Sequence, residues 1–195
     1  MWSFRAGGDL MDWPVPITPT MPMIFSWSSE ALGCLMSTLA SSQITSEVST
    51  SYPAANRILY IPFSLGRTVV VAQMFVYNGA FTGGPNINLG IYSQSGTRLV
   101  ETGTTAQTGT SSLQVIDITD TTIGPGSFYL AVIATATTAN MFMINFTNAE
   151  FARAAGLFQE AGTGSTLPTT ATFSSTTSSV VPMFGFTTRS EVVSF

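Results

Sequence analysis

The sequence predicts an all-β domain, and three observations carry this prediction. Apolar and polar residues alternate in short runs; in the clearest run, Asn86–Glu101, this places Ile87, Leu89 and Ile91 on one face. Clusters of Gly, Asn, Ser and Pro separate the runs, as turns do. No helical segments alternate with them. We therefore expect a two-layer antiparallel β-sandwich, jelly-roll-like, with an extended N-terminal arm and one or two short helices.

The chain has 195 residues and divides into an N-terminal docking arm, residues 1–51, and a β-sandwich domain, residues 52–195. All three tryptophans fall in the arm, and four prolines from Pro14 to Pro22 favour an extended course there. An extended segment has little core of its own. Its aromatic side chains are therefore expected to dock on the following domain or on a neighbouring subunit. These docking residues are Trp2, Phe4, Trp13, Phe25 and Trp27.

A short helix is expected within the arm, near residues 29–40. Ser28 or Ser29 can cap it, Glu30 suits its first turn, and apolar residues follow at helical spacing. The polar stretch 43–51 is then expected to be a linker.

Eight strands are expected in the sandwich domain, and two of them form a hairpin around a turn at Gly96. The runs 68–77 and 127–135 are expected to need cover on their second face, from a symmetry mate or from the arm. A shift of apolar phase between Val115 and Ile116 predicts a β-bulge. The strands are 56–63, 68–77, the two sides of the 86–101 hairpin, 113–119, 127–135, 141–146 and 180–187. Residues expected inside the sandwich are Ile87, Leu89, Ile91, Leu130 and Phe142.

Two further segments complete the domain. Asn148 can cap a second short helix that runs to Ala155 and ends at Gly156. The stretch 162–179 is rich in Thr and Ser and contains Pro168, so we expect a long irregular loop.

The composition argues against several classes of function. Charged residues make up 8% of the chain, and there is no lysine or histidine. The scattered arginines form no basic patch, so nucleic acid is not an expected partner. No apolar run approaches the roughly 20 residues that span a bilayer, so no membrane span is expected. A surface so poor in charge fits either an extracellular polar β protein or a subunit partly buried by its neighbours.

No catalytic, cofactor-binding or metal-binding residue is predicted, and the chain is not expected to be an enzyme. Cys34 has no histidine to act as its base and is expected to be a small buried apolar residue. Asp117 and Asp120 lie three residues apart and could offer oxygens to Ca²⁺, but too few acidic residues accompany them to predict a site.

One group of residues points to ligand binding. Aromatic rings and amide groups, the side chains used in sugar recognition, cluster in the sequence around one loop and two strand ends. The alternative is that these rings fill the end of the sandwich. The candidate glycan contacts are Tyr77, Asn78, Phe81, Asn86 and Tyr92.

Five segments together resemble a recurring pattern in structural proteins of tailed bacteriophages. In this pattern a strand ending in Gly-Ile-Tyr leads to a Gly turn, and a later Pro-Gly turn leads into an aromatic strand. The resemblance covers about two thirds of the chain. The segments are NRILYIPF (56–63), NLGIYSQSGTR (88–98), LQVIDIT (113–119), GPGSFYL (124–130) and VPMFGF (181–186).

The resemblance implies a non-enzymatic virion protein that docks through its arm and displays the sandwich. A tail fibre or tail-tip component is the first expectation, and a capsid decoration (cement) protein is the alternative. A stand-alone carbohydrate-binding module is a further alternative. The expected partners are further copies of the chain in a homotrimer, other virion proteins and a host surface glycan. The three-fold symmetry comes from the resemblance alone.

Overall fold

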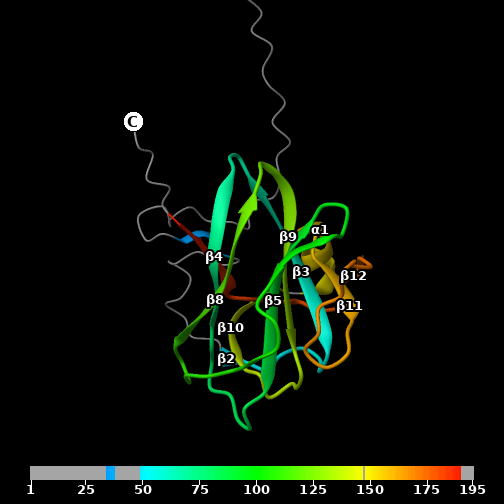
Figure 1. The fold of residues 1–195 in the computed structure, drawn as a ribbon. Helices are drawn as coiled ribbons and strands as arrows, with labels where there is room; N and C mark the ends of the chain where they lie inside the picture. The colour runs from blue at the N-terminus through cyan, green and yellow to red at the C-terminus, as the bar shows by residue number, and fades with distance from the viewer. Residues whose placement is uncertain (1–33, 38–48, 147, 190–195) are drawn as a thin grey trace, which may run out of the picture.

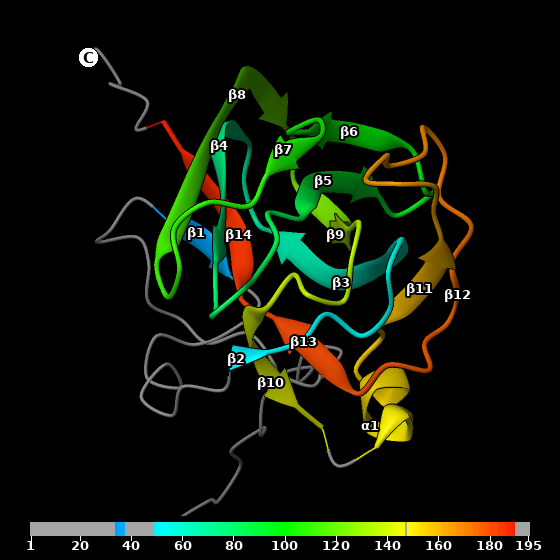
Figure 2. The same ribbon diagram turned by 90° about the horizontal axis from the view of Figure 1, so that it is seen from below.

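The computed structural model describes residues 34–37, 49–146 and 148–189. These residues form fourteen strands and one short helix, and every strand pair among them is antiparallel. Two sheets face each other, and a third, smaller sheet lies along one side of the gap between them (Figures 1 and 2). The predicted all-β sandwich is therefore confirmed.

The four-stranded sheet forms one layer, and its strands follow in the order β1-β14-β4-β8. Its bounds are β1 Cys34–Ser37, β14 Phe184–Thr188, β4 Val69–Tyr77 and β8 Leu113–Ile123. The strand β14, close to the end of the described chain, thus lies between two strands from much earlier in the sequence.

The seven-stranded sheet forms the opposite layer, in the order β12-β11-β3-β9-β5-β6, with β7 also paired to β5. Its central strands are β3 Arg57–Leu65, β9 Gly126–Ala134 and β5 Asn86–Ser93. The outer ones are β6 Arg98–Glu101, β7 Thr105–Ala106, β11 Phe158–Ala161 and β12 Ser174–Ser175.

The main core lies between these two layers. The five residues expected inside the sandwich are all buried members of this core, with exposed fractions from 0% to 6%. The hairpin around Gly96 is also confirmed: β5 and β6 pair, and Gly96 has the left-handed φ of 90° that the turn requires. Regular alternation therefore predicted β5 and the residues that it contributes to the main core.

The three-stranded sheet contains β13 Val180–Pro182, β10 Met141–Asn145 and β2 Ser49–Thr50. The single strand expected over 180–187 is therefore divided between two sheets. The division falls at Met183, whose N–H donates to Phe142 O at 2.8 Å and whose carbonyl accepts from Tyr77 N at 2.9 Å. These two bonds turn the chain from β13 into β14.

The helix expected near 29–40 is wrong where the structure describes it. Cys34–Ser37 form the strand β1, paired with β14 from Cys34 opposite Thr187 to Ser37 opposite Gly185. Without β1, the edge of β14 would present unpaired N–H and C=O groups, and pairing them outweighs a weak helical pattern that follows Gly33. The expected linker also joins the fold, since Ser49–Thr50 pair with β10.

The second expected helix is confirmed as α1, Ala149–Ala154. The side-chain Oδ1 of Asn148 accepts a hydrogen bond from Glu150 N at 3.0 Å, as an N-cap does. Gly156 ends the helix with a φ of 78°.

The bulge in β8 lies later in the strand than predicted. Val71 of β4 opposes Thr121, whereas Gln73 opposes Asp117, so Ala72 alone faces three residues of β8. The position expected from the sequence, between Val115 and Ile116, is regular in register. The side chain of Val115 is exposed although it is apolar, so in the sequence it looks like a shift of the apolar face of the strand.

The stretch 162–179 is largely irregular, as expected, but it has a definite structural role. Leu167 packs on the outer face of the seven-stranded sheet with Tyr60, Tyr92 and Ile133, forming a second buried cluster, and Phe173 packs against it. The second face of β9 is therefore covered by the chain itself. The expectation that this face needs a symmetry mate or the arm is wrong.

Candidate functional site

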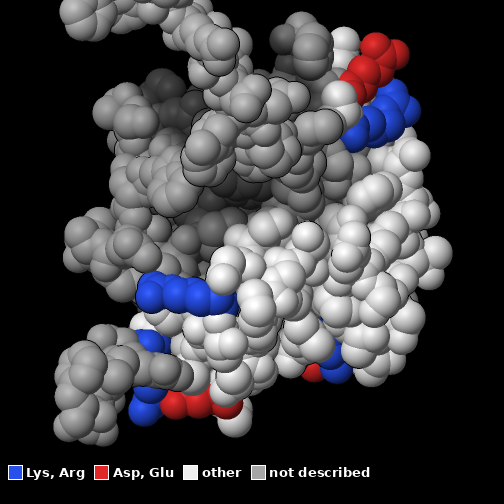
Figure 3. Space-filling view, turned by 90° about the horizontal axis from the view of Figure 1, so that it is seen from above, with Lys and Arg blue, Asp and Glu red and all other residues white. Residues whose placement is uncertain are grey.

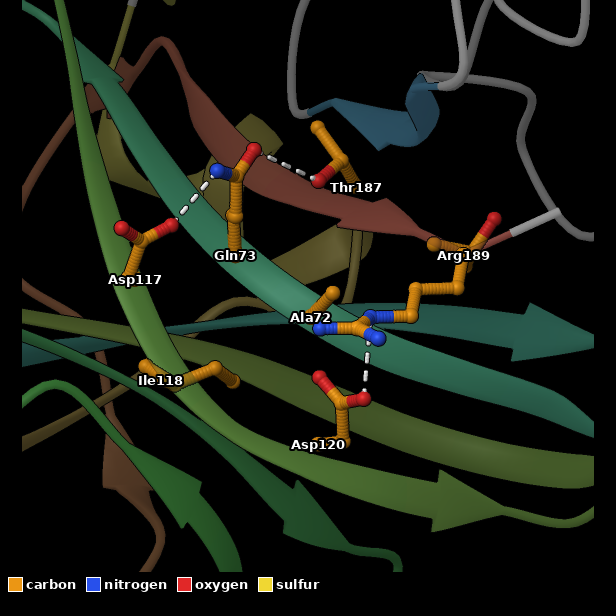
Figure 4. Close-up of a pocket in the computed structure, with 8 residues that line it drawn as sticks. Ala72, Gln73, Asp117, Ile118, Asp120, Thr187 and Arg189 are labelled. Carbon is orange, nitrogen blue, oxygen red and sulfur yellow. Dashed lines mark hydrogen bonds and ion pairs between the residues drawn. The ribbon is translucent and has the colours of Figure 1, made fainter.

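A polar hollow of about 390 Å³ opens on the outer face of the four-stranded sheet. It is built on the bulge in β8 and extends across β4 to the end of β14 (Figure 4). Its lining consists of Ala72, Gln73, Asp117, Ile118, Asp120, Thr187, Thr188 and Arg189. We refer to it below as the hollow.

One amide group connects three strands at one side of the hollow. Gln73 Nε2 donates to Asp117 Oδ1 at 2.6 Å, and Gln73 Oε1 accepts from Thr187 Oγ1 at 3.3 Å. The three residues lie side by side because the β14–β4–β8 register places them in one row. The Gln73 side chain is therefore fixed at both ends, with its polar atoms toward the outer face (Figure 4).

An ion pair forms the other side of the hollow. Arg189 Nε lies 2.9 Å from Asp120 Oδ2, and the Arg189 side chain passes over β4 at Ala72 to reach it (Figure 4). The backbone N–H of Arg189 donates to Val70 O at 3.0 Å, which holds the residue beside β4. The Arg189 side chain is 69% exposed, so the pair contributes little to stability but keeps charged hydrogen-bonding groups at the surface.

The bulge creates this geometry. Because Ala72 faces three residues of β8, the strand bows outward there and presents Asp120 on the surface. Thr121 Oγ1 donates to Thr119 O at 2.9 Å within the bulged segment. Without the bulge, Asp120 would lie opposite a different residue of β4.

The chemistry of the hollow suits an uncharged, hydroxyl-rich ligand. It offers carboxylate acceptors, guanidinium donors and a threonine hydroxyl within one concave surface. Calcium is a poor fit, because the Arg189 guanidinium already pairs with Asp120. Among the described residues, no group of three or more His, Cys, Asp or Glu could hold a metal ion.

The same outer face is apolar beyond the hollow. Phe75 opposes Val115 on β8 and Gly185 on β14, two residues along each strand from the Gln73 row. Val115 is 46% exposed and nearby Leu113 is 51% exposed. Together, Phe75, Leu113 and Val115 form what we call the apolar strip.

Charge is sparse on the surface as well as in the sequence. In the view of Figure 3, charged side chains lie in a few separate places and most of the described surface is uncharged.

The structure does not bring the five candidate glycan contacts together. Asn78 and Tyr92 are completely buried. Asn78 Nδ2 donates to Gln114 Oε1 at 3.0 Å, and Tyr92 Oη donates to Pro168 O at 2.6 Å. Neither side chain is available to a ligand at the surface, since each is enclosed by its own chain.

The structure places the other three candidates on different elements. The half-buried Tyr77 packs edge-on against Phe142, with ring centroids 4.5 Å apart. Phe81 lies in the loop that follows β4. Asn86 lies at the start of β5, at the opposite end of that strand from Tyr92. The alternative interpretation, in which these rings fill the sandwich, describes Tyr77 and Tyr92 better.

The five predicted docking residues of the arm lie outside the described residues. Within the hollow, the sequence had singled out Asp117 and Asp120 but not Gln73, Thr187 or Arg189. No local pattern could have selected these three, because their contacts depend on the strand register and on the bulge.

Comparisons of the chain with protein-family models, with curated proteins and with solved structures found no match. No helix in the described part of the chain is long and apolar enough to cross a membrane.

Proposed function

We propose that this chain is a non-enzymatic structural protein of a tailed-phage virion, attached through its N-terminal region and displaying the β-sandwich. The main structural support is the way in which that region joins the domain. β1 is paired into the four-stranded sheet and β2 into the three-stranded sheet. A segment held by two backbone ladders can fix the sandwich firmly to whatever its upstream residues bind.

A tail fibre or tail-tip component is the position that we propose first, with capsid decoration as the alternative. Both come from the resemblance, and the low charge of the surface suits a subunit in an assembly. A homotrimer also comes from the resemblance. The cover of β9 by residues 162–179 removes one of the two apolar faces from which the sequence argued for an oligomer.

The decisive experiment locates the protein in an electron-microscopy map of the intact particle. We expect density for the sandwich on the tail, and density on the capsid would select the decoration alternative. A variant lacking residues 1–33 keeps β1 and β2, so it should fold but fail to join the particle. A purified virion that lacks the protein, or normal incorporation of the truncated variant, would contradict the proposal.

Carbohydrate binding is the second candidate function, and the hollow is the observation that favours it. Carboxylates, a guanidinium and a hydroxyl around a concave surface can share hydrogen bonds with adjacent sugar hydroxyls. The glycan would then bind across β4, β8 and β14 rather than at the residues that the sequence suggested.

This candidate predicts a specific loss of binding. If a neutral oligosaccharide binds in titration calorimetry, Asp117→Ala should weaken it about tenfold, because hydrogen bonds to a charged group are lost. Glu150→Ala, an exposed carboxylate on α1, should leave the affinity unchanged. Equal effects of the two substitutions, or no binding across a broad panel of neutral sugars, would rule out the hollow as a glycan site.

A further inference from the structure

We propose that the outer face of the four-stranded sheet is the docking surface for residues 1–33 of the same chain. The proposal concerns how the N-terminal residues are held. It does not depend on the virion function, and it assigns an occupant to the apolar strip.

The strip shows an uneven pattern of burial. Phe75 is 4% exposed, yet neither of the two hydrophobic clusters of described residues includes it. Its neighbours Met74 and Val76 point into the main core, so strand alternation directs Phe75 outward. Leu113 and Val115 on the same face are about half exposed. The open part of the strip therefore consists of two aliphatic side chains, Leu113 and Val115, and exposed apolar surface of this kind favours cover.

The entry point of the chain favours residues 1–33 as the occupant. β1 begins at Cys34 and pairs with β14, so the described chain begins at the edge of this sheet. Gly185 of β14, between β1 and Phe75, has no side chain to obstruct a segment that crosses there. β1 is the edge strand of this sheet, and no other layer of described residues covers the sheet's outer face (Figure 2).

Length does not limit this arrangement. Thirty-three residues in an extended or polyproline conformation reach about 100 Å, at roughly 3.1 Å per residue. Crossing from β1 to β8 takes only about 15 Å, since neighbouring strands lie about 4.8 Å apart. A small part of the segment is enough to cover the strip.

The chemistry of the segment matches the strip. It carries Trp2, Trp13 and Trp27, and its prolines prevent it from forming a helix with a buried face of its own. Proline-rich segments bind apolar and aromatic surfaces through side chains, without needing a free strand edge. Because β14 is paired on both edges, with β1 and with β4, a segment that crosses it can dock only through side chains on the face.

The three tryptophans give a direct measurement, because all of them lie in residues 1–33. Tryptophan emission and its quenching by acrylamide therefore report only on this segment. The test compares the full-length protein with Val115→Asp and Leu113→Asp, which place a charge on the strip. Leu99→Asp is the matched control, because Leu99 on β6 is also an exposed leucine, at 38%, in the other layer.

We expect blue-shifted, poorly quenched emission from the full-length protein. In both strip variants, quenching by acrylamide should rise about twofold as the indole rings lose their cover. Chymotryptic cleavage after Phe25 and Trp27, each followed by serine, should accelerate in parallel. The Leu99→Asp protein should behave as the parent, and far-ultraviolet circular dichroism should show that all variants remain folded.

Two results would overturn the proposal. In the first, the tryptophans of the parent are already open to acrylamide, or the strip variants leave quenching and cleavage unchanged. In the second, protection disappears on dilution while light scattering shows an oligomer becoming a monomer. A second copy of the chain would then be the occupant of the strip.

Discussion

At the scale of single residues, Asn78 connects segments that are distant in the sequence. It is completely buried after the end of β4. Its Nδ2 donates to Thr108 O at 2.7 Å and to Gln114 Oε1 at 3.0 Å, and its Oδ1 accepts from Gln107 Nε2 at 2.7 Å. A buried amide with three bonds is a structural residue, which explains why an apparent sugar-binding amide is part of the interior.

Replacing this side chain should therefore cost stability. Asn78→Leu keeps a similar volume but removes the donor and the acceptor, leaving buried partners unsatisfied. We expect the free energy of unfolding to fall by about 2–3 kcal/mol. Urea denaturation measures it, and Gln94→Leu, at an exposed turn position, is the control. Equal stability of the two variants would mean that the network contributes little.

At the scale of elements, residues 162–179 act as a cover for the seven-stranded sheet. Leu167 packs in the second cluster, and Thr97 forms a bridge with Thr170. The close approach depends on Gly90 of β5, where an added Cβ would lie 2.7 Å from Leu167 Cδ1 and 2.9 Å from Val100 O. The glycine in this strand allows the segment above it and the strand beside it to come close.

Gly90→Ala should therefore destabilise the protein. Leu167 can adjust, but the backbone oxygen of Val100 cannot move without disturbing the β5–β6 pairing. We expect a loss of about 1–3 kcal/mol, typical of overpacking, seen as a lower urea midpoint. Gly66→Ala is the control, because an added Cβ there meets no atom within 4 Å. A parental midpoint for Gly90→Ala would show that the approach is looser than the structure indicates.

Elements differ in how far the sequence could predict them. Alternation was sufficient for β5, whose core residues Ile87, Leu89 and Ile91 fall at every second position, and a continuous apolar run indicated β9. It could not place the bulge, which depends on how Ala72 of β4 aligns with β8. It also missed the division at Met183, which depends on hydrogen bonds to two distant strands. The error at β1 has the same origin, since that strand exists through its pairing with β14.

At the scale of the whole molecule, the hollow joins parts of the chain that no local pattern relates. Gln73 lies 44 residues from Asp117 and 114 residues from Thr187 in the sequence. The sequence therefore singled out the two carboxylates of the hollow, Asp117 and Asp120, but not the residues that they contact. The overall architecture could be predicted from short local patterns in the sequence. The site could not, because its residues come together only when the strands of the sheet pair.

The buried tyrosines give the whole molecule a predicted response to alkaline pH. Burial raises the pKa of Tyr52, of Tyr60 and of Tyr92 well above the usual value of 10.0. The charged form is the phenolate, so folding favours the neutral hydroxyl. The stabilisation is complete below pH 10 and is lost progressively as the pH rises above it.

We therefore expect the melting temperature to fall steeply above pH 10, together with a cooperative rise in phenolate absorbance. Tyr52 belongs to the main core, and Tyr60 and Tyr92 belong to the second cluster, so both sides of the seven-stranded sheet should respond. Tyr52→Phe and Tyr92→Phe should each reduce the steepness of this fall. Gradual phenolate formation with no loss of structure would contradict the expectation.

The position of β14 also has a consequence for how the protein is made. This strand lies between β1 and β4, although it is among the last described segments of the chain. During synthesis, the seven-stranded layer can assemble its central strands β3, β5 and β9 once residue 134 has emerged. The opposite layer must wait for residues 184–188, because β1 has no partner until β14 arrives. Until then, the nascent chain carries an open edge on β4, and a ribosome that stalls before this point would release an unfinished sandwich.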